Sequence, residues 1–124
     1  MKDFLSEVDV TSPTAVYVQI EDQVRLAVAA GDILPSERLP SIKDLSDRLG
    51  VNPNTVAKSY RDLELLGILY TRRGMGVFIT DEAPAICKRR AEERLRRLAK
   101  ELASEARAAG LKSSEVRKII DEAA

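Results

Sequence analysis

Apolar side chains recur at helical spacing near the start of the chain. The repeating positions are three or four residues apart: Val16, Ile20, Val24 and Ala27 or Val28. This spacing places apolar groups on one face of a helix, and Gly31 supplies a typical stop. The pattern predicts a helix over residues 13–30. Residues 1–12 have no clear period and are expected to form a loose arm.

Two more helical patterns follow an extended connector, "DILPSERLP". Ser41, with Asp44 three residues later, is typical of a helix start, so a helix is expected over residues 41–49, ending at Gly50. A longer helix is expected over residues 53–66. The apolar positions of the two helices are Ile42, Leu45 and Leu49, then Val56, Tyr60, Leu63 and Leu66. A short helix, a tight turn and a longer helix form the helix-turn-helix arrangement.

Alternating residues then replace the helical period in "ILYTRRGMGVFIT". Ile68 and Tyr70 on one side, and Val77 and Ile79 on the other, flank a glycine-containing tip. This pattern predicts a β-hairpin over residues 68–80. Helix, helix-turn-helix and hairpin occur in the order of a winged helix-turn-helix domain. We therefore expect a mainly α fold with a small β-hairpin, the domain occupying residues 1–80.

The last part of the chain, residues 81–124, is predicted to form a two-helix tail. A first tail helix is expected over residues 85–109, with one apolar stripe: Ala91, Leu95, Leu98, Leu102, Ala106 and Ala109. Gly110 ends it. The segment "LKSSEVRKIIDEA" predicts a short final helix, capped by Ser113 or Ser114. Its expected inward-facing residues are Val116, Ile119 and Ile120.

Composition narrows the chemistry that the chain can perform. The 124 residues include no histidine, which removes imidazole bases, Ser-His pairs and ordinary zinc sites, so we expect neither an enzyme nor a bound cofactor or metal. The single cysteine, Cys87, cannot form an internal disulfide, and this favours the cytoplasm. No apolar run approaches the roughly 20 residues that span a bilayer, so no membrane association is expected.

Charge is distributed unevenly although the formal net charge is zero. Residues 1–37 carry two basic and seven acidic side chains, whereas residues 38–80 carry seven basic and four acidic ones. A local basic excess of this kind can form a surface that faces phosphates.

The start of the helix at residues 53–66 is unusually polar. Asn52 before Pro53 is a plausible N-cap with a proline at the first helical position. Capping needs only these two residues, yet Asn54 and Thr55 extend the polar surface, and Lys58 projects from a similar side. Amide, hydroxyl and ammonium groups bind phosphates and base edges, and the helix N-terminus favours anions. The alternative is that these residues only cap the helix and solvate a turn.

A family resemblance adds to this pattern. "ILPSERLPSIKDLSDRLGVNPNTVAKSYRDLELLGILYTRRGMGVFI" resembles the DNA-binding domain of the GntR family of bacterial transcription regulators. "VNPNTVAKSYRDLE" and "SPTAVYVQIEDQV" are similar to its YtrA-like branch, and the short tail also matches that branch. Family members often have glycine where Ser36 stands, and threonine where Val77 stands.

The resemblance implies a set of DNA-binding residues. Arg38, Ser41 and Lys43 are expected to position the DNA backbone, and a group on the third helix to contact bases in the major groove. The wing is expected to reach the minor groove or its phosphates. The third-helix and wing residues are Asn52, Asn54, Thr55 and Lys58, then Arg72, Arg73, Gly74 and Gly76.

The tail is expected to form a homodimer. Burial of a leucine side chain contributes roughly 1.5–3 kcal/mol, and a lone helix cannot bury its stripe unaided. The resemblance favours exchange of tail helices between subunits through Ala91, Leu95, Leu98, Leu102 and Ala106. The alternative is a tail that folds back on its own domain. A dimer would bind an inverted-repeat operator on double-stranded DNA.

The functional hypothesis is a sequence-specific regulator, expected to be a repressor. The resemblance further implies control of a transporter operon, and it leaves room for a small-molecule effector that the sequence does not name. A different class of function remains open: a winged helix that binds proteins without specific DNA binding. Such a face would expose apolar or aromatic anchors. Cys87 is expected to fill a core position, a redox role being the alternative.

Overall fold

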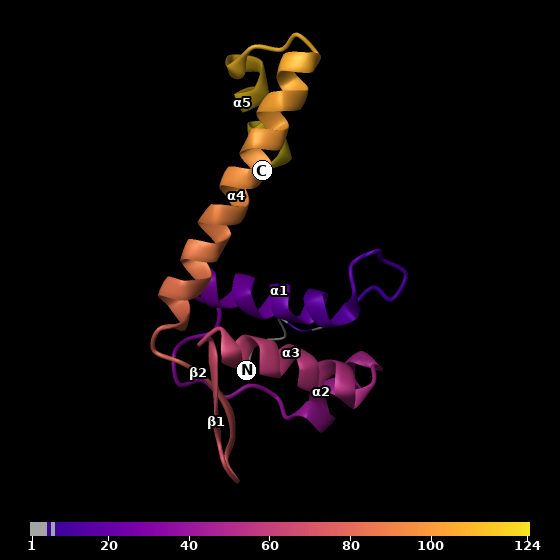
Figure 1. Cartoon of the computed structure of the whole chain (residues 1–124), viewed down its shortest axis with the longest axis vertical. Helices are drawn as coiled ribbons and strands as arrows, with labels where there is room; N and C mark the ends of the chain where they lie inside the picture. Colours follow the sequence, from indigo (N-terminus) through magenta and orange to yellow (C-terminus); the bar gives the residue numbers. More distant parts are fainter. Residues whose placement is uncertain (1–4, 6) are drawn as a thin grey trace. The chain divides into compact units, whose positions relative to one another are not determined.

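The elements occur in the predicted order. The structure, a computed structural model, describes Leu5 and residues 7–124. Its helices and strands are α1 (Val16–Ala29), α2 (Ile42–Leu49), α3 (Pro53–Leu65), β1 (Leu69–Arg72), β2 (Gly76–Ile79), α4 (Ala83–Ala108) and α5 (Ser113–Ala123) (Figure 1). The mainly helical fold with one antiparallel hairpin confirms the predicted fold class.

The chain divides into two compact units between Arg89 and Arg90, within α4. The first unit holds the helix-turn-helix, the hairpin and the start of α4. The second holds the remainder of α4 and α5. Over Leu5 and residues 7–124, none of the helices has both the length and the apolar character needed to cross a membrane.

The segment before α1 is more ordered than expected. Leu5 is buried in the core, and Gln23 Nε2 donates to the carbonyl of Glu7 at 3.0 Å. Gln19 and Asp9 exchange two hydrogen bonds, each 2.8 Å long. The prediction of a loose arm over residues 1–12 is therefore wrong for Leu5 and residues 7–12. Residues 1–4 and 6 lie outside the described part.

The helix α1 begins at Val16, three residues later than predicted. Ala15 has an extended conformation, with φ −57° and ψ 145°. The preceding chain forms a local turn, in which the Thr14 N–H donates to Ser12 Oγ at 3.1 Å. The side chain of Gln19 also donates to the Thr14 carbonyl at 2.9 Å. These bonds hold the chain out of the helix until Val16.

The helix-turn-helix is formed by the capping groups that the sequence predicts. Ser41 Oγ accepts the Asp44 N–H at 3.0 Å, and Gly50 ends α2 with φ 67°. Asn52 Oδ1 accepts the Asn54 N–H at 2.8 Å, and Pro53 stands at the first position of α3. Left-handed backbone favours glycine because it lacks Cβ, so the turn between α2 and α3 depends on Gly50.

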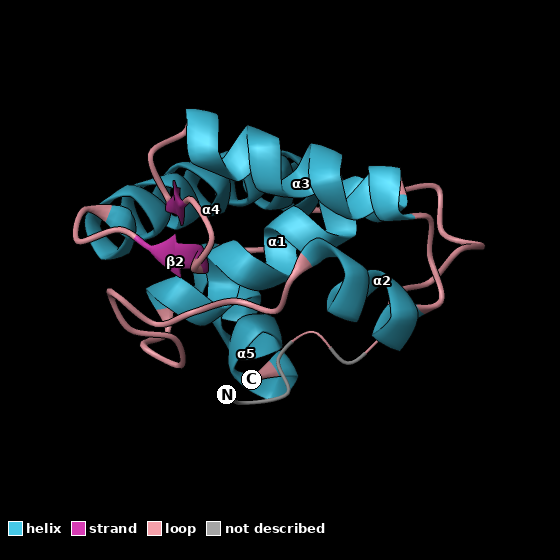
Figure 2. Cartoon of the chain, turned by 90° about the horizontal axis from the view of Figure 1, so that it is seen from below, coloured by secondary structure: helices cyan, strands magenta, loops and turns pink. Residues whose placement is uncertain are grey.

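α1 and α2 both pack against α3 (Figure 2). Ser59, which is fully buried on α3, donates its hydroxyl to the Tyr17 carbonyl of α1 at 2.9 Å. The buried hydroxyl of Tyr60 donates to the Pro40 carbonyl at 2.8 Å. These two bonds satisfy polar groups inside the core and fix α3 between α1 and the connector before α2.

The hairpin is confirmed, and its buried side chains lie at the end of the hairpin away from the tip. Leu69 pairs with Ile79, and both side chains are buried. Tyr70 is half-buried and stacks on its cross-strand partner Phe78, with ring centroids 5.6 Å apart. Ile68 is buried as well but precedes the strand, so two successive apolar residues enter the core and shift the alternation by one residue.

The core lies among α1, α2, α3, the hairpin and the start of α4. Cys87 is one of its buried residues, as expected of a small apolar filler. Two predicted core residues are exposed instead: Ile42 and Leu66 each keep 37% of their surface. Ile42 is the first residue of α2, and Leu66 is the residue that caps α3, so both lie at helix ends where the core does not reach.

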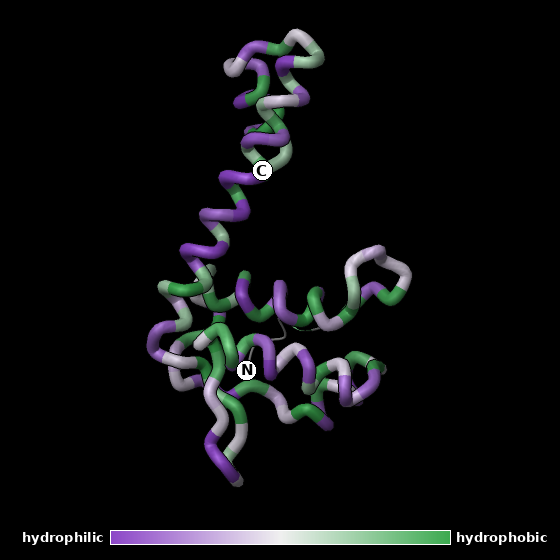
Figure 3. Tube along the Cα trace, viewed as in Figure 1, coloured by the Kyte–Doolittle hydropathy of each residue, from purple (hydrophilic) through white to green (hydrophobic). Residues whose placement is uncertain are grey.

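The second unit buries little of its apolar surface. The predicted stripe of α4 retains exposed fractions of 63% at Leu95, 47% at Leu98 and 37% at Leu102. Ala106 is buried. Figure 3 shows apolar positions among hydrophilic ones along this part of α4 and along α5. A unit that leaves large leucines in solvent has surface available for a partner.

The N-cap of the final helix lies one residue before Ser113, the earlier of the two predicted caps. Lys112 occupies the N-cap, and its N–H donates to the carboxylate of Glu115 at 3.2 Å, so neither Ser113 nor Ser114 caps the helix. Val116 is half-buried, whereas Ile119 and Ile120 remain about half exposed. The expected inward face agrees with the groove between α4 and α5 that Val116 and Ile120 line, whereas Ile119 is not among the residues that line it.

Candidate nucleic-acid interface

The first turn of α3 presents a polar surface to solvent. Asn52 and Asn54 are exposed and Thr55 is half-buried. Because Asn52 Oδ1 is used by the cap, contact by Asn52 with a phosphate would fall to its amide nitrogen. Behind this turn, Val56 is fully buried. The helix thus has one face in the core and its first turn open to a ligand.

Lys58 lies one turn further along α3 and is held in place by two neighbours. Its ammonium group is 3.5 Å from the carboxylate of Asp62, and its side chain remains 49% exposed. The same nitrogen lies 4.6 Å from the centre of the Tyr17 ring of α1. A cation over an aromatic face is attracted by the ring. These two contacts therefore fix the position of the Lys58 ammonium group beside the first turn of α3.

Glu21 of α1 completes this cluster. It lies four residues after Tyr17, and its carboxyl group hydrogen-bonds to Asp62. Partial burial, followed by the hydrogen bond to Asp62 and its charge, raises the pKa of Glu21 to about 7, while Arg25 and Lys58 act in the opposite direction. A hydrogen bond between two carboxyl groups requires one of them to carry a proton. The pair joins α1 to α3 beside Lys58.

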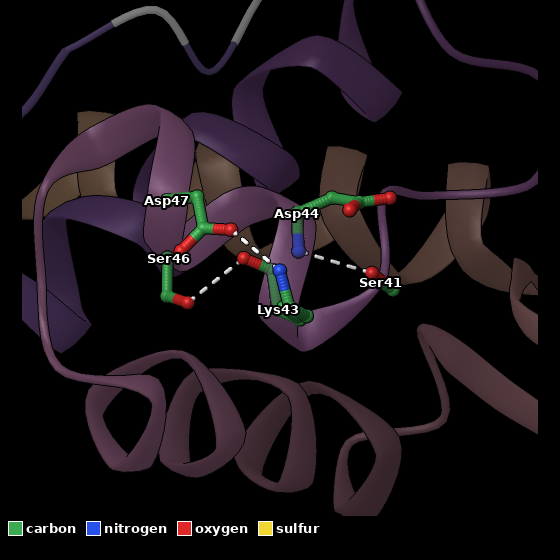
Figure 4. Close-up of polar contacts among 5 residues, drawn as sticks. All are labelled: Ser41, Lys43, Asp44, Ser46 and Asp47. Atoms are coloured by element: carbon green, nitrogen blue, oxygen red, sulfur yellow. Dashed lines mark hydrogen bonds and ion pairs between the residues drawn. The ribbon is translucent and has the colours of Figure 1, made fainter.

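The start of α2 holds Ser41 and Lys43 (Figure 4). Lys43 Nζ lies 3.0 Å from Asp47 Oδ2 one turn along the helix, and this hydrogen bond raises the pKa of Lys43. Ser46 Oγ donates to the Lys43 carbonyl at 2.9 Å. Both members of the Lys43–Asp47 pair are largely exposed. Solvent screens such a pair strongly, so the ammonium group can exchange Asp47 for a phosphate.

Arg38 is positioned by backbone pairing with the hairpin. The Leu39 N–H donates to the Val77 carbonyl at 2.8 Å, and the Ile79 N–H donates to the Glu37 carbonyl at 3.0 Å. Arg38 thereby pairs with Phe78 on the outer edge of β2. A Cβ atom built on Gly76, whose φ is 123°, would lie 2.7 Å from Arg38 Nε. The guanidinium group therefore lies directly against Gly76.

The tip of the hairpin carries Arg72, Arg73 and Gly74, all exposed. The Met75 N–H donates to the Arg72 carbonyl at 2.9 Å, and Gly74 adopts φ 77° with open space around its Cβ position. The tip is thus a tight turn with a small, open surface. Backbone without side chains can approach another molecule closely.

The structure brings some predicted site residues together and leaves others apart. Arg38 contacts Gly76, and Asn52 contacts Asn54. The start of α2, the start of α3 and the hairpin all belong to the first unit, whereas Ala91, Leu95, Leu98, Leu102 and Ala106 belong to the second. Binding of DNA by the first set and dimerisation through the second set stay predictions.

Sequence reasoning missed the neighbours of Lys58. Tyr17 and Glu21 are four residues apart on α1, and Lys58 and Asp62 are four residues apart on α3. Each spacing is visible in the sequence and puts two side chains on one helix face. The meeting of the two faces depends on how α1 packs on α3, which the sequence does not state.

Comparison with known proteins identifies the family. The sequence pattern described as "Bacterial regulatory proteins, gntR family" matches residues 16–79. The HTH-type transcriptional regulator Rv1152 of Mycobacterium tuberculosis is 38% identical over 115 residues, which cover 93% of this chain and 89% of that protein. The HTH-type transcriptional repressor YtrA of Bacillus subtilis is 39% identical over 77 residues, 62% of this chain.

Coverage differs among these relatives. The matched region covers 59% of YtrA and 62% of the B. subtilis regulator YhcF, so the chain spans about three fifths of their length. All these names are those of transcription regulators and not of enzymes.

Solved structures agree on the fold. A transcriptional regulator from Oenococcus oeni superposes with a TM-score of 0.76 at 30% identity, over 93% of this chain and 95% of that one. The DNA-binding domain of AraR, solved in complex with operator ORX1, has a TM-score of 0.53 at 26% identity, over 60% of this chain and 94% of that one. With its winged helix-turn-helix and its relatives among the YtrA-like regulators, the chain belongs to the gntR family of bacterial regulatory proteins.

Proposed function

We propose that the chain is a transcriptional repressor that binds an inverted-repeat operator as a homodimer in the cytoplasm. Residues 1–80 bind the DNA, and residues 81–124 join the subunits. The observation that supports this most is the two-faced α3, with Val56 and Leu63 fully buried and Asn54 open to solvent. Asn54, Thr55 and Lys58 contact base edges in the major groove.

The other candidate residues support binding by positioning the DNA. Ser41 and Lys43 at the start of α2 contact the phosphate backbone, as does the amide of Asn52. Arg38, lying on Gly76, places a cation at the base of the wing, and Arg72 and Arg73 extend positive charge to its tip, where Gly74 allows close approach. The name of YtrA, a repressor, supports repression, and the AraR complex supports operator binding.

The dimer is proposed from the apolar surface of the second unit. Leu95 and Leu98 are about half exposed or more. A groove of about 330 Å³ between α4 and α5 is lined by Leu102, Ala106, Leu111, Val116 and Ile120 among others. A second copy presents the same leucines, so a two-fold axis would cover both surfaces at once. Ala91 extends the same stripe.

Selection of bound duplexes from a random DNA pool tests the proposal. An enriched inverted repeat is expected, with log Kobs falling with log salt by roughly 0.9 per neutralised phosphate. Thr55→Ala and Lys58→Ala should each reduce discrimination by on the order of 1–3 kcal/mol per base contact. Lys88→Ala, an exposed lysine on α4, serves as the control that removes one positive charge.

The dimer has its own test. Leu98→Glu places a charge in the proposed interface and should give a monomer in sedimentation equilibrium. Leu26→Glu changes a leucine of α1 that is 62% exposed and should leave the dimer intact. A wild-type chain that sediments as a monomer would refute this part of the proposal.

The regulated genes and the effector are proposed only by class. We infer control of a transporter operon from the YtrA-like resemblance, and a small-molecule effector that acts on the tail. The alternative, a protein-interaction module, predicts that no DNA sequence is enriched from the pool. The polar first turn of α3 speaks against it, because protein-binding faces centre on apolar and aromatic anchors.

A further inference from the structure

We propose that Arg61 of α3 is a further DNA-contacting residue, whose guanidinium group binds a phosphate on the strand opposite the one that meets the start of α3. The inference rests on the proposed function, because it takes α3 as the helix that enters the major groove. Arg61 lies outside the set of contacts that the family resemblance implies, and it adds one cation to the DNA interface of each subunit.

Arg61 lies on the exposed face of α3. Four exposed residues follow one another along this helix at spacings of four, three and four: Asn54, Lys58, Arg61 and Leu65. These spacings place the four side chains on one side of the helix. The other side is held in the core, where Leu63 is fully buried. Arg61 therefore belongs to the same surface as Asn54 and Lys58.

The charge of Arg61 is available to a ligand. Three other cations of α1, α2 and α3 each form an ion pair with a carboxylate: Arg25, Lys43 and Lys58. Within the part of the chain that the structure describes, Arg61 has neither an ion pair nor a hydrogen bond from its side chain. Arg61 can therefore bind a phosphate directly, whereas Lys58 must first exchange Asp62 for it.

The distance along α3 fits the width of the major groove. Asn52, the N-cap whose amide is proposed to contact a phosphate, precedes Arg61 by nine residues. A helix rises 1.5 Å per residue, so the two residues are about 13–14 Å apart along the axis. The major groove is about 12 Å wide. A helix that meets one strand at Asn52 therefore brings Arg61 to the phosphates of the other strand, with Asn54 and Lys58 facing base edges in between.

A contact of Arg61 with phosphate has a distinct energetic signature. A guanidinium group can donate two parallel hydrogen bonds to a phosphate. Such a contact carries no direct sequence information, so Arg61 adds affinity without changing the sequence that is bound. Each neutralised phosphate releases counterions, and log Kobs then falls with log salt by roughly 0.9 more. Loss of Arg61 should therefore make binding less sensitive to salt.

The test uses the duplex that the full chain selects from a random DNA pool. Arg61→Gln should bind it with a salt slope smaller than that of the wild type by roughly 0.9 per bound subunit. For a dimer, the affinity advantage of the wild type should then shrink roughly tenfold between about 50 mM and 200 mM salt. Arg61→Lys keeps the charge and should keep the slope. Lys88→Gln removes a cation from an exposed position of α4 and, as the matched control, should also keep it.

A chemical change in the DNA locates the contact. In a series of duplexes, each phosphate is replaced in turn by a neutral methylphosphonate. The wild type should lose affinity at one position of each half-site where Arg61→Gln loses none. Equal salt slopes for the wild type and Arg61→Gln would overturn the inference and leave the repressor proposal standing. A changed sequence selected by Arg61→Gln would also overturn it, because Arg61 would then contact a base. Failure of the wild type to enrich any duplex would overturn both proposals.

Discussion

The contact between Arg38 and Gly76 can be tested as an interaction energy. Gly76→Ala has two consequences: it forces a side chain into φ 123°, and it places Cβ 2.7 Å from Arg38 Nε. Strained backbone of this kind costs roughly 1–3 kcal/mol. Displacement of Arg38 from its rotamer adds about 0.5–1.5 kcal/mol. The backbone strain is present with or without Arg38, whereas the rotamer cost arises only when Arg38 is present.

A double-mutant cycle separates the two costs. Gly76→Ala is measured in the wild-type background and in the Arg38→Ala background, by urea unfolding at one protein concentration. The substitution should be less destabilising, by about 1 kcal/mol, once Arg38 is absent. Gly74→Ala is the matched control: Gly74 also has positive φ, 77°, but nothing lies within 4 Å of its Cβ position. Its cost should be the same in both backgrounds.

The outcome decides whether the wing positions Arg38. A coupling energy near zero between Arg38→Ala and Gly76→Ala would show that the guanidinium group does not lie on Gly76 in solution. Coupling of similar size for Gly74 would show that Arg38 acts on the hairpin as a whole. Either result would refute the positioning of Arg38 by Gly76.

Three further predictions concern stability. Tyr60→Phe leaves the buried Pro40 carbonyl without its 2.8 Å hydrogen bond and should lower the free energy of urea unfolding by about 1–3 kcal/mol. Tyr70→Phe is the control, because it keeps the ring stacked on Phe78, and it should lower this free energy less. Ser36→Gly should stabilise by roughly 0.5–1 kcal/mol and raise Tm, because Ser36 has φ 69° and left-handed backbone favours glycine; a lower Tm would contradict this. The pKa of Glu21 is raised in the folded state from 4.5 to about 7, so the wild type should lose stability relative to Glu21→Gln as pH rises from 4.5 to 7. The pKa shift sets an upper limit of about 3 kcal/mol on this loss, and solvent screening reduces it to on the order of 1 kcal/mol. Parallel profiles of unfolding free energy against pH for the two proteins would contradict the prediction.

Local signals predicted the helix-turn-helix well. Ser41 and Asn52 cap α2 and α3 through bonds to residues two or three positions away, and Gly50 makes the turn. Such groups act within one helical turn, so the sequence contains the whole interaction. Ser36 also adopts the left-handed conformation, with φ 69°, and this backbone favours glycine at that position.

Contacts between distant residues were not predictable in the same way. Gln19 and Gln23 bind Asp9 and Glu7, which lie ten and sixteen residues earlier in the chain, and no helical or strand period relates residues at these separations. The burial of Ile68 directly before the first strand depends on the core that surrounds it and does not follow from the alternation of the hairpin. In the site, exposed polar residues of α3 were predictable from their period, but the contact of Tyr17 with Lys58 depends on tertiary packing.

The contact of Tyr17 with Lys58 also has an optical consequence. The chain has three tyrosines and no tryptophan, so its near-ultraviolet emission comes from tyrosine alone. Tyr60 is buried and hydrogen-bonded, and Tyr70 is stacked on Phe78, whereas Tyr17 lies 4.6 Å from the ammonium group of Lys58. A ligand that draws Lys58 away changes the surroundings of this ring first. Tyr17 thus gives the molecule an intrinsic fluorophore beside α3, and DNA binding could be followed without attaching a dye.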